Sequence, residues 1–85
     1  MSYRPALAGR ALAQFNDLKD DQVIYDALME RIVQLADEPW DAWPVYPGGE
    51  EPEFREAQFG AHGLLSFRVD ENAEILIIFS ILWIG

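Results

Sequence analysis

Residues 75–85, with the sequence ILIIFSILWIG, form an almost unbroken apolar run that only Ser80 interrupts. The run is too short to span a membrane, because a spanning helix needs about 20 apolar residues. Its β-branched and aromatic side chains favour a long strand over a helix. An antiparallel strand with one solvated face would alternate apolar and polar residues, so this strand needs cover on both faces. We therefore expect it in the centre of a sheet, with helices on one face and a partner on the other.

The composition excludes several kinds of functional site. The chain has no cysteine, which excludes disulfides, thiolate nucleophiles and the usual structural zinc sites. His62 is the only histidine, and we expect neither a metal nor a cofactor. The 15 acidic residues outnumber the 6 basic ones and give a net charge of −9, most of it in residues 39–85. Since a negative chain repels nucleic acid, we expect weak nucleic-acid binding by the protein alone.

The length of the chain and its N-terminal segment indicate the number of domains and the cellular location. Its 85 residues predict one small domain, which we assign to residues 1–85. We find no basic-then-apolar leader and no stretch long enough to span a membrane. The sequence therefore predicts a cytoplasmic protein with no membrane association.

The first part of the chain predicts an antiparallel helical hairpin over residues 5–38. Residues at helical spacing favour a first helix over 5–18, and these are Leu7, Ala11, Phe15 and Leu18. Asp20 is a candidate N-cap for a second helix that runs to about Asp37. The apolar stripe of this second helix consists of Ile24, Leu28, Ile32 and Leu35. Two helices joined by about three residues should run in opposite directions.

Residues 39–53 predict a loop, because they hold four of the five prolines and a Gly-Gly pair. Their aromatic side chains, Trp40, Trp43 and Tyr46, either seal the edge of the core or stack on nucleotide bases, and we favour the first interpretation.

The rest of the chain, residues 54–85, predicts an antiparallel sheet with strands over 54–59, 64–69 and 73–84. In the middle strand, Leu65, Phe67 and Val69 point to one face while Leu64, Ser66 and Arg68 point to the other. One face of the sheet is thus fully apolar and should meet the helices.

The segment FREAQFGAHGLLSFRVDENAEILIIFSILWIG follows a helical hairpin and a proline-rich loop. Its order is a basic strand, a glycine turn, a strand ending in arginine, an acidic turn and an isoleucine-rich strand with an aromatic end. This order resembles the RelE/ParE superfamily of small bacterial toxins over most of the chain. The resemblance implies an α+β fold, with the antiparallel helical hairpin packed on one face of a three- to four-stranded antiparallel sheet.

The resemblance also implies a function, that of the toxin component of a bacterial type II toxin–antitoxin system. RelE-like toxins cut mRNA on the ribosome, using cationic side chains on the open face of the sheet and an aromatic or basic residue near the C-terminus. The implied activity is a ribosome-dependent mRNA endoribonuclease, with an antitoxin, the ribosome and mRNA as partners. Such a transesterification needs a base for the 2′-hydroxyl, charge stabilisation at the phosphate and an acid for the leaving oxygen.

The candidate site residues follow from this resemblance. Arg55 and Arg68 would stabilise the phosphate and Glu56 would act as the base, while Trp83 and His62 would contact the substrate. The plainer interpretation is that both arginines pair with nearby carboxylates at the surface and that His62 is simply exposed.

A second function stays open, that of a catalytically silent relative acting as a protein-binding or dimerisation module. The excess of acidic residues favours a binding protein without catalytic activity, whereas the resemblance favours an origin among the toxins. The outer face of the final strand would then contact an antitoxin or a second copy of the chain, and we expect the protein not to be a monomer.

Overall fold

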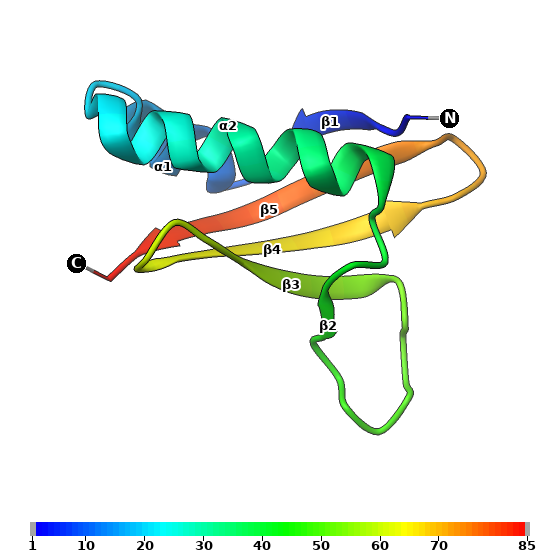
Figure 1. The fold of residues 1–85 in the computed structure, drawn as a ribbon. Coiled ribbons are helices and arrows are strands. Elements are labelled where there is room, and N and C mark those ends of the chain that lie inside the picture. The colour runs from blue at the N-terminus through cyan, green and yellow to red at the C-terminus, as the bar shows by residue number, and fades with distance from the viewer. Residues whose placement is uncertain (1, 85) are drawn as a thin grey trace.

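The computed structural model describes residues 2–84, in which two helices cover one face of a five-stranded sheet (Figure 1). The elements are β1 (Arg4–Leu7), α1 (Ala11–Leu18), α2 (Gln22–Asp37), β2 (Trp43–Pro44), β3 (Phe54–Phe59), β4 (Gly63–Asp70) and β5 (Ile75–Trp83). Met1 and Gly85, which belong to the expected range 1–85, lie outside the described residues.

The final strand lies inside the sheet, as its apolar composition predicts. The strand order is β1-β5-β4-β3-β2, so β5 pairs with β1 on one side and with β4 on the other. The expectation of a three- to four-stranded antiparallel sheet is wrong in two respects. The sheet has five strands, and it is mixed because β1 pairs with β5 in parallel.

The extra parallel strand comes from residues that helical spacing had assigned to the first helix. The Arg4 backbone N–H donates to the Glu74 carbonyl (2.9 Å) and the Ala8 N–H donates to the Ile78 carbonyl (2.9 Å), which ties this segment to β5. Gly9 then adopts φ +58°, a left-handed conformation that separates β1 from α1. The spacing of Leu7 with the helical residues was therefore misleading, because Leu7 belongs to the strand.

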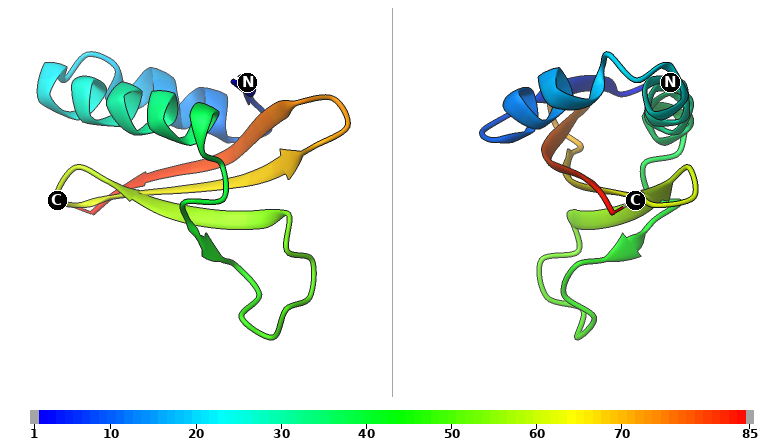
Figure 2. Two further views of the ribbon diagram at one scale, coloured as in Figure 1. Left: turned by 45° about the vertical axis from the view of Figure 1, so that its right-hand side comes forward. Right: turned by 90° about the vertical axis from the view of Figure 1, so that its left-hand side faces the viewer.

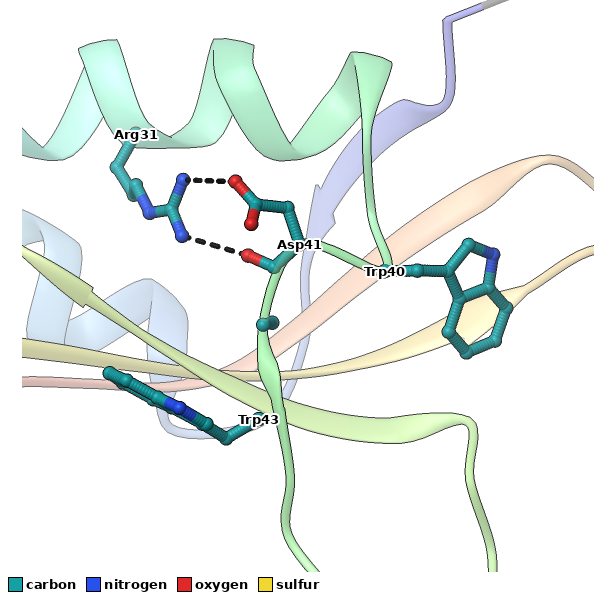
Figure 3. Close-up of a pocket in the computed structure, with 5 residues that line it drawn as sticks. Arg31, Trp40, Asp41 and Trp43 are labelled. Atoms are coloured by element: carbon teal, nitrogen blue, oxygen red, sulfur yellow. Dashed lines mark hydrogen bonds and ion pairs between the residues drawn. The ribbon is translucent and has the colours of Figure 1, made fainter.

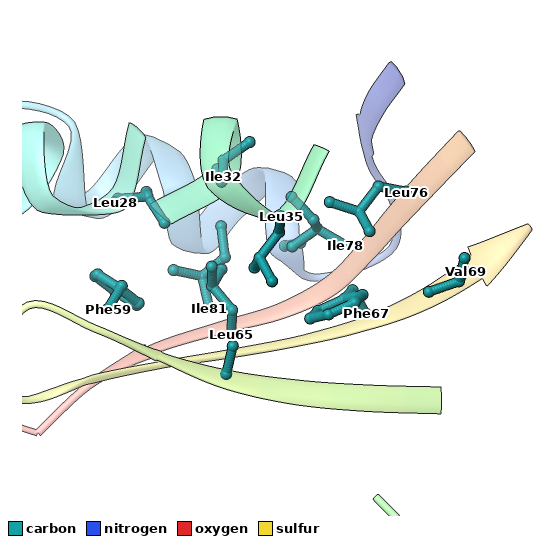
Figure 4. Close-up of a cluster of buried hydrophobic side chains, with 12 residues drawn as sticks. Leu28, Ile32, Leu35, Phe59, Leu65, Phe67, Val69, Leu76, Ile78 and Ile81 are labelled. Carbon is teal, nitrogen blue, oxygen red and sulfur yellow. The ribbon is translucent and has the colours of Figure 1, made fainter. Parts of the chain in front are cut away.

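The helices run in opposite directions above the sheet (Figure 2). The N-cap of α2 is Asp21 rather than Asp20, since the Asp21 carboxylate accepts from the backbone N–H groups of Val23 (3.1 Å) and Ile24 (3.2 Å). The buried residues of α2 are Leu28, Ile32, Leu35 and Ala36. Leu28, Ile32 and Leu35 belong to one cluster with the buried side chains of β3, β4 and β5, as Figure 4 shows.

A β-bulge in β5 decides which of its side chains face the helices. Ser66 of β4 pairs with Ser80, whereas the next residue, Phe67, pairs with Ile78, so Phe79 is an extra residue on β5. Ile78 and Ile81 both reach the core as a result, while Phe79 turns to the opposite face. The alternation predicted for the middle strand is confirmed, because every second residue of β4 is buried.

Side chains from the helices close two strand edges that the short outer strands leave uncovered. Beyond the end of β1, the backbone N–H of Ile81 donates to the Gln14 side-chain oxygen of α1 (2.7 Å). Beyond the end of β2, the Gln58 carbonyl of β3 accepts from Arg31 Nε of α2 (3.1 Å). These contacts satisfy edge groups that would otherwise offer a pairing site to another strand.

The backbone of Gly63 lies so close to the Phe59 ring that adding a methyl group at Gly63 should destabilise the fold. A Cβ atom built on Gly63 would lie 2.4 Å from Cζ of Phe59, which is 1% exposed and fixed in the core. We expect Gly63→Ala to lower the free energy of unfolding by about 1–3 kcal/mol. Urea denaturation measures it, with Gly48→Ala as the control, because a Cβ atom at Gly48 meets no atom within 4 Å. Equal stability of the two variants would mean that the Phe59 ring can move aside.

Candidate functional site on the open face of the sheet

The face of the sheet away from the helices carries the side chains that remain available for function. We call it the open face, since both helices lie on the other side (Figures 1 and 2). Strand pairing places side chains from all the inner strands on its centre, and these are Phe54, Glu56, Ser66, Arg68, Ile77 and Phe79. These side chains lie on the face opposite to that of the buried residues of the same strands.

An aromatic row crosses the open face. The ring of Phe54 lies 5.9 Å from that of Phe79 on β5 and 6.1 Å from that of Tyr46 in the 45–53 loop, measured between centroids. Both pairs are edge-to-face, the arrangement that aromatic quadrupoles favour. The row therefore connects the loop to β5, and Tyr46 at its end is 42% exposed.

Two of the predicted site residues lie together on this face. Arg68 is paired with Phe54 across the ladder, and Glu56 is paired with Ser66. Glu56 and Arg68 are thus diagonal neighbours, which in an antiparallel pair places them about 7–8 Å apart. Arg68 Nη2 also lies 3.9 Å from Asp70 Oδ2, so that a carboxylate offsets part of its charge.

Arg55 is on the opposite face, and the expectation that it joins Arg68 on the open face is wrong. It is paired with the buried Phe67, so it points to the helix side. Its Nη2 donates to the Ala42 carbonyl (2.6 Å), and its guanidinium carbon lies 5.4 Å from the centre of the Trp40 ring. The buried Nε of Arg55 makes no hydrogen bond. Arg55 therefore joins the 39–53 loop to β3 instead of facing solvent as a phosphate contact.

Trp83 and His62 lie near each other but far from Arg68. Their ring centroids are 5.8 Å apart, and Trp83 also packs against Phe59, 5.7 Å away on the helix side. Trp83 is paired with Gly63, five residues before Arg68 along β4, which corresponds to about 17 Å. The five predicted residues thus fall into three places, with Glu56 and Arg68 in one, Trp83 and His62 in another, and Arg55 alone in the third.

A polar pocket lies where the segment after α2 meets β3 (Figure 3). Its volume is about 260 Å³, and Arg31, Trp40, Asp41, Ala42 and Trp43 line it. Arg31 Nη2 donates to the Asp41 carbonyl (2.8 Å), and Arg31 Nη1 lies 3.6 Å from the Asp41 carboxylate. Sequence patterns could not identify this role of Arg31, because the backbone carbonyls that it binds are ten and 27 positions away.

The aromatic side chains of the loop do not seal the core, so that expectation is wrong. Trp40 is 40% exposed, Tyr46 42% and Trp43 60%. Trp43 is paired with Glu56 across β2 and β3, which places an exposed ring beside a carboxylate on the open face.

Within residues 2–84, no group of three or more His, Cys, Asp or Glu side chains is placed to hold a metal ion. In the same range no helix is long and apolar enough to cross a membrane.

Desolvation raises the pKa of the Tyr3 hydroxyl, with Glu71 and then Glu74 adding to the effect.

The strand order and the helical hairpin define an α+β fold of the RelE type. Two solved structures of a double arginine-to-alanine mutant of the E. coli toxin RelE share this fold. The free form superimposes with a TM-score of 0.77 at 17% identity, covering 95% of this chain and 82% of that one. The form bound to an antitoxin RelBc peptide gives 0.75 at 15% identity, covering 100% and 86%. No protein-family model and no curated protein sequence matches the chain.

The different placements of the two arginines predict different effects on stability. We expect Arg55→Ala to lower the free energy of unfolding by about 1.5–3 kcal/mol, because its guanidinium holds the loop through charged hydrogen bonds. Arg68→Ala should change it by about 0.5 kcal/mol or less, since a half-exposed ion pair contributes little. Urea denaturation of both variants is the measurement. A larger loss for Arg68→Ala than for Arg55→Ala would contradict this assignment.

Proposed function

We propose that this chain is the toxin-like member of a bacterial toxin–antitoxin pair and that it acts in the cytoplasm by binding an antitoxin protein on its open face. The RelE fold supports the first part, and a RelE structure with a bound antitoxin peptide supports a protein partner. The observation that carries the second part is the aromatic row of Tyr46, Phe54 and Phe79 on a face that no helix covers. Tyr46 is 42% exposed and the other two rings are partly exposed, and apolar and aromatic surface of this kind is typical of protein interfaces.

The charges of the open face favour protein binding over RNA cleavage. Arg55, the first candidate for phosphate binding, is engaged on the helix side by the Ala42 and Pro52 carbonyls. Arg68 is accompanied by Asp70 at 3.9 Å and by Glu56 diagonally across the ladder. The carboxylates of this face would repel the phosphates of RNA. Tight phosphate binding needs clustered cations, and these carboxylates offset the charge of Arg68.

A ribosome-dependent mRNA endoribonuclease is the second candidate, because Glu56 and Arg68 share the open face beside Ser66. In this mechanism Glu56 would take the proton of the ribose 2′-hydroxyl and Arg68 would stabilise the developing negative charge at the phosphate. The leaving oxygen would also need an acid. Trp83 cannot transfer a proton at neutral pH, and His62 lies with it at the far end of β4. The arrangement therefore supports cleavage less well than binding.

Growth of cells that express the chain separates the two candidates. We expect induction in E. coli to leave growth unchanged, and the variants Arg68→Ala and Glu56→Gln to behave like the wild type. Growth curves, with immunoblots to match protein levels, are the measurement. Growth arrest relieved by both substitutions would favour the endoribonuclease over the silent binding protein.

The antitoxin part of the proposal is tested with the product of the reading frame adjacent to this gene. We expect the two proteins to elute together, with a light-scattering mass above the 9.7 kDa of this chain alone. Independent elution at micromolar concentrations would contradict the proposed pairing.

A further inference from the structure

The open face has an apolar centre with an acidic border. Next to the aromatic row lie Glu56 on β3 and Asp70 on β4. Residues 45–53, which carry Tyr46 at the end of the row, contain three glutamates and no basic residue. The basic side chains on this face are Arg68, which Asp70 accompanies at 3.9 Å, and Arg4 on the outer strand. The border is therefore negative, in line with the net charge of −9.

One position on this border has the chemistry of a cation site. Trp43 and Glu56 are directly paired across β2 and β3, so their side chains leave the same face about 5 Å apart. Trp43 is 60% exposed, so much of its surface is accessible to a partner. An arginine or lysine side chain is attracted both to the face of an indole ring and to a carboxylate.

The same charges disfavour other occupants of the face. A second copy of the chain, related by a two-fold axis, would bring two acidic borders together, and such like-charge contacts oppose association. RNA would bring its phosphates to the same carboxylates. Strand addition to the uncovered parts of β3 and β5 is also disfavoured, since Arg31 and Gln14 already bind them.

We infer that the open face binds a basic amphipathic segment of a partner protein, which places apolar side chains on the aromatic row and an arginine or lysine between Trp43 and Glu56. This inference rests on the proposed function and adds the chemistry of the partner. The row provides the apolar contact area, and the acidic border sets the sign of the charges that the segment carries.

Two synthetic peptides of 18 residues test the inference. One has leucine on one helical face and arginine on the other, and its counterpart has glutamate in place of each arginine. At physiological salt we expect the basic peptide to bind and the acidic peptide not to bind. Amide chemical shifts of the labelled protein should change in β2, β3 and the bulge of β5 rather than in α1 and α2. Equal binding of both peptides, or shift changes confined to the helices, would overturn the inference.

Matched variants test the proposed contacts. Glu56→Gln and Trp43→Ala should each weaken binding of the basic peptide about two- to fivefold. Glu30→Gln removes the same charge from the exposed side of α2, and Leu12→Ala removes an exposed apolar side chain from α1, and both should bind like the wild type. An effect of Glu30→Gln as large as that of Glu56→Gln would mean that only the overall charge matters, which also overturns the inference.

The two proposals fail in different ways. If the adjacent gene product binds but shifts the helix amides, the inference is wrong and the pairing stands. If that product does not bind, while the basic peptide binds the open face and responds to Glu56→Gln, the pairing is wrong and the inference stands. A concentration-dependent dimer that perturbs the open face, or an oligouridine RNA that does so, would replace the basic segment as its occupant.

Discussion

The inclusion of β5 between two other strands is the constraint on which the rest of the structure depends. Its backbone is paired on both sides, in parallel with β1 and antiparallel with β4, so its apolar side chains can only face up or down from the sheet. The helices cover the upper side, where Leu76, Ile78 and Ile81 are at most 1% exposed. The lower side has no such cover, and this asymmetry produces the open face.

The bulge at Phe79 determines what that face contains. Without the extra residue, strict alternation after Ile78 would direct Ser80 into the core and Ile81 away from it. With it, Ile81 is buried among the helix residues, and Phe79 joins Phe54 on the open face. The backbone N–H of Ile81 is then satisfied by Gln14 of α1. One irregularity in β5 thus completes the core and adds Phe79 to the end of the aromatic row.

The sequence predicted the elements whose residues interact locally or repeat regularly. The second helix, the strand over 54–59 and the alternation of the middle strand follow from periodicity, and the structure contains all of them. Periodicity failed at β1, because parallel pairing with β5 depends on a strand about 70 residues away, at positions such as Ile75. The placement of Arg55 failed for a related reason, since its face depends on the register with Phe67. Strand alternation was enough to predict that Glu56 and Arg68 share a face. The position of Trp43 beside Glu56 could not be predicted in this way, because it depends on the pairing of the two-residue strand β2.

The similarity to RelE is one of backbone fold, whereas the side chains that the fold carries determine the chemistry of the protein. Arg31 and Arg55 have structural roles, because each binds backbone carbonyls of the segment that follows α2. They hold the stretch that carries Trp43 and Tyr46 against the sheet, and so they position aromatic groups on the open face without lying on it. Two of the six basic side chains are therefore used to support the surface, and the carboxylates dominate its border. On this fold the chain presents an aromatic row within an acidic border, which is the electrostatic complement of a basic protein segment.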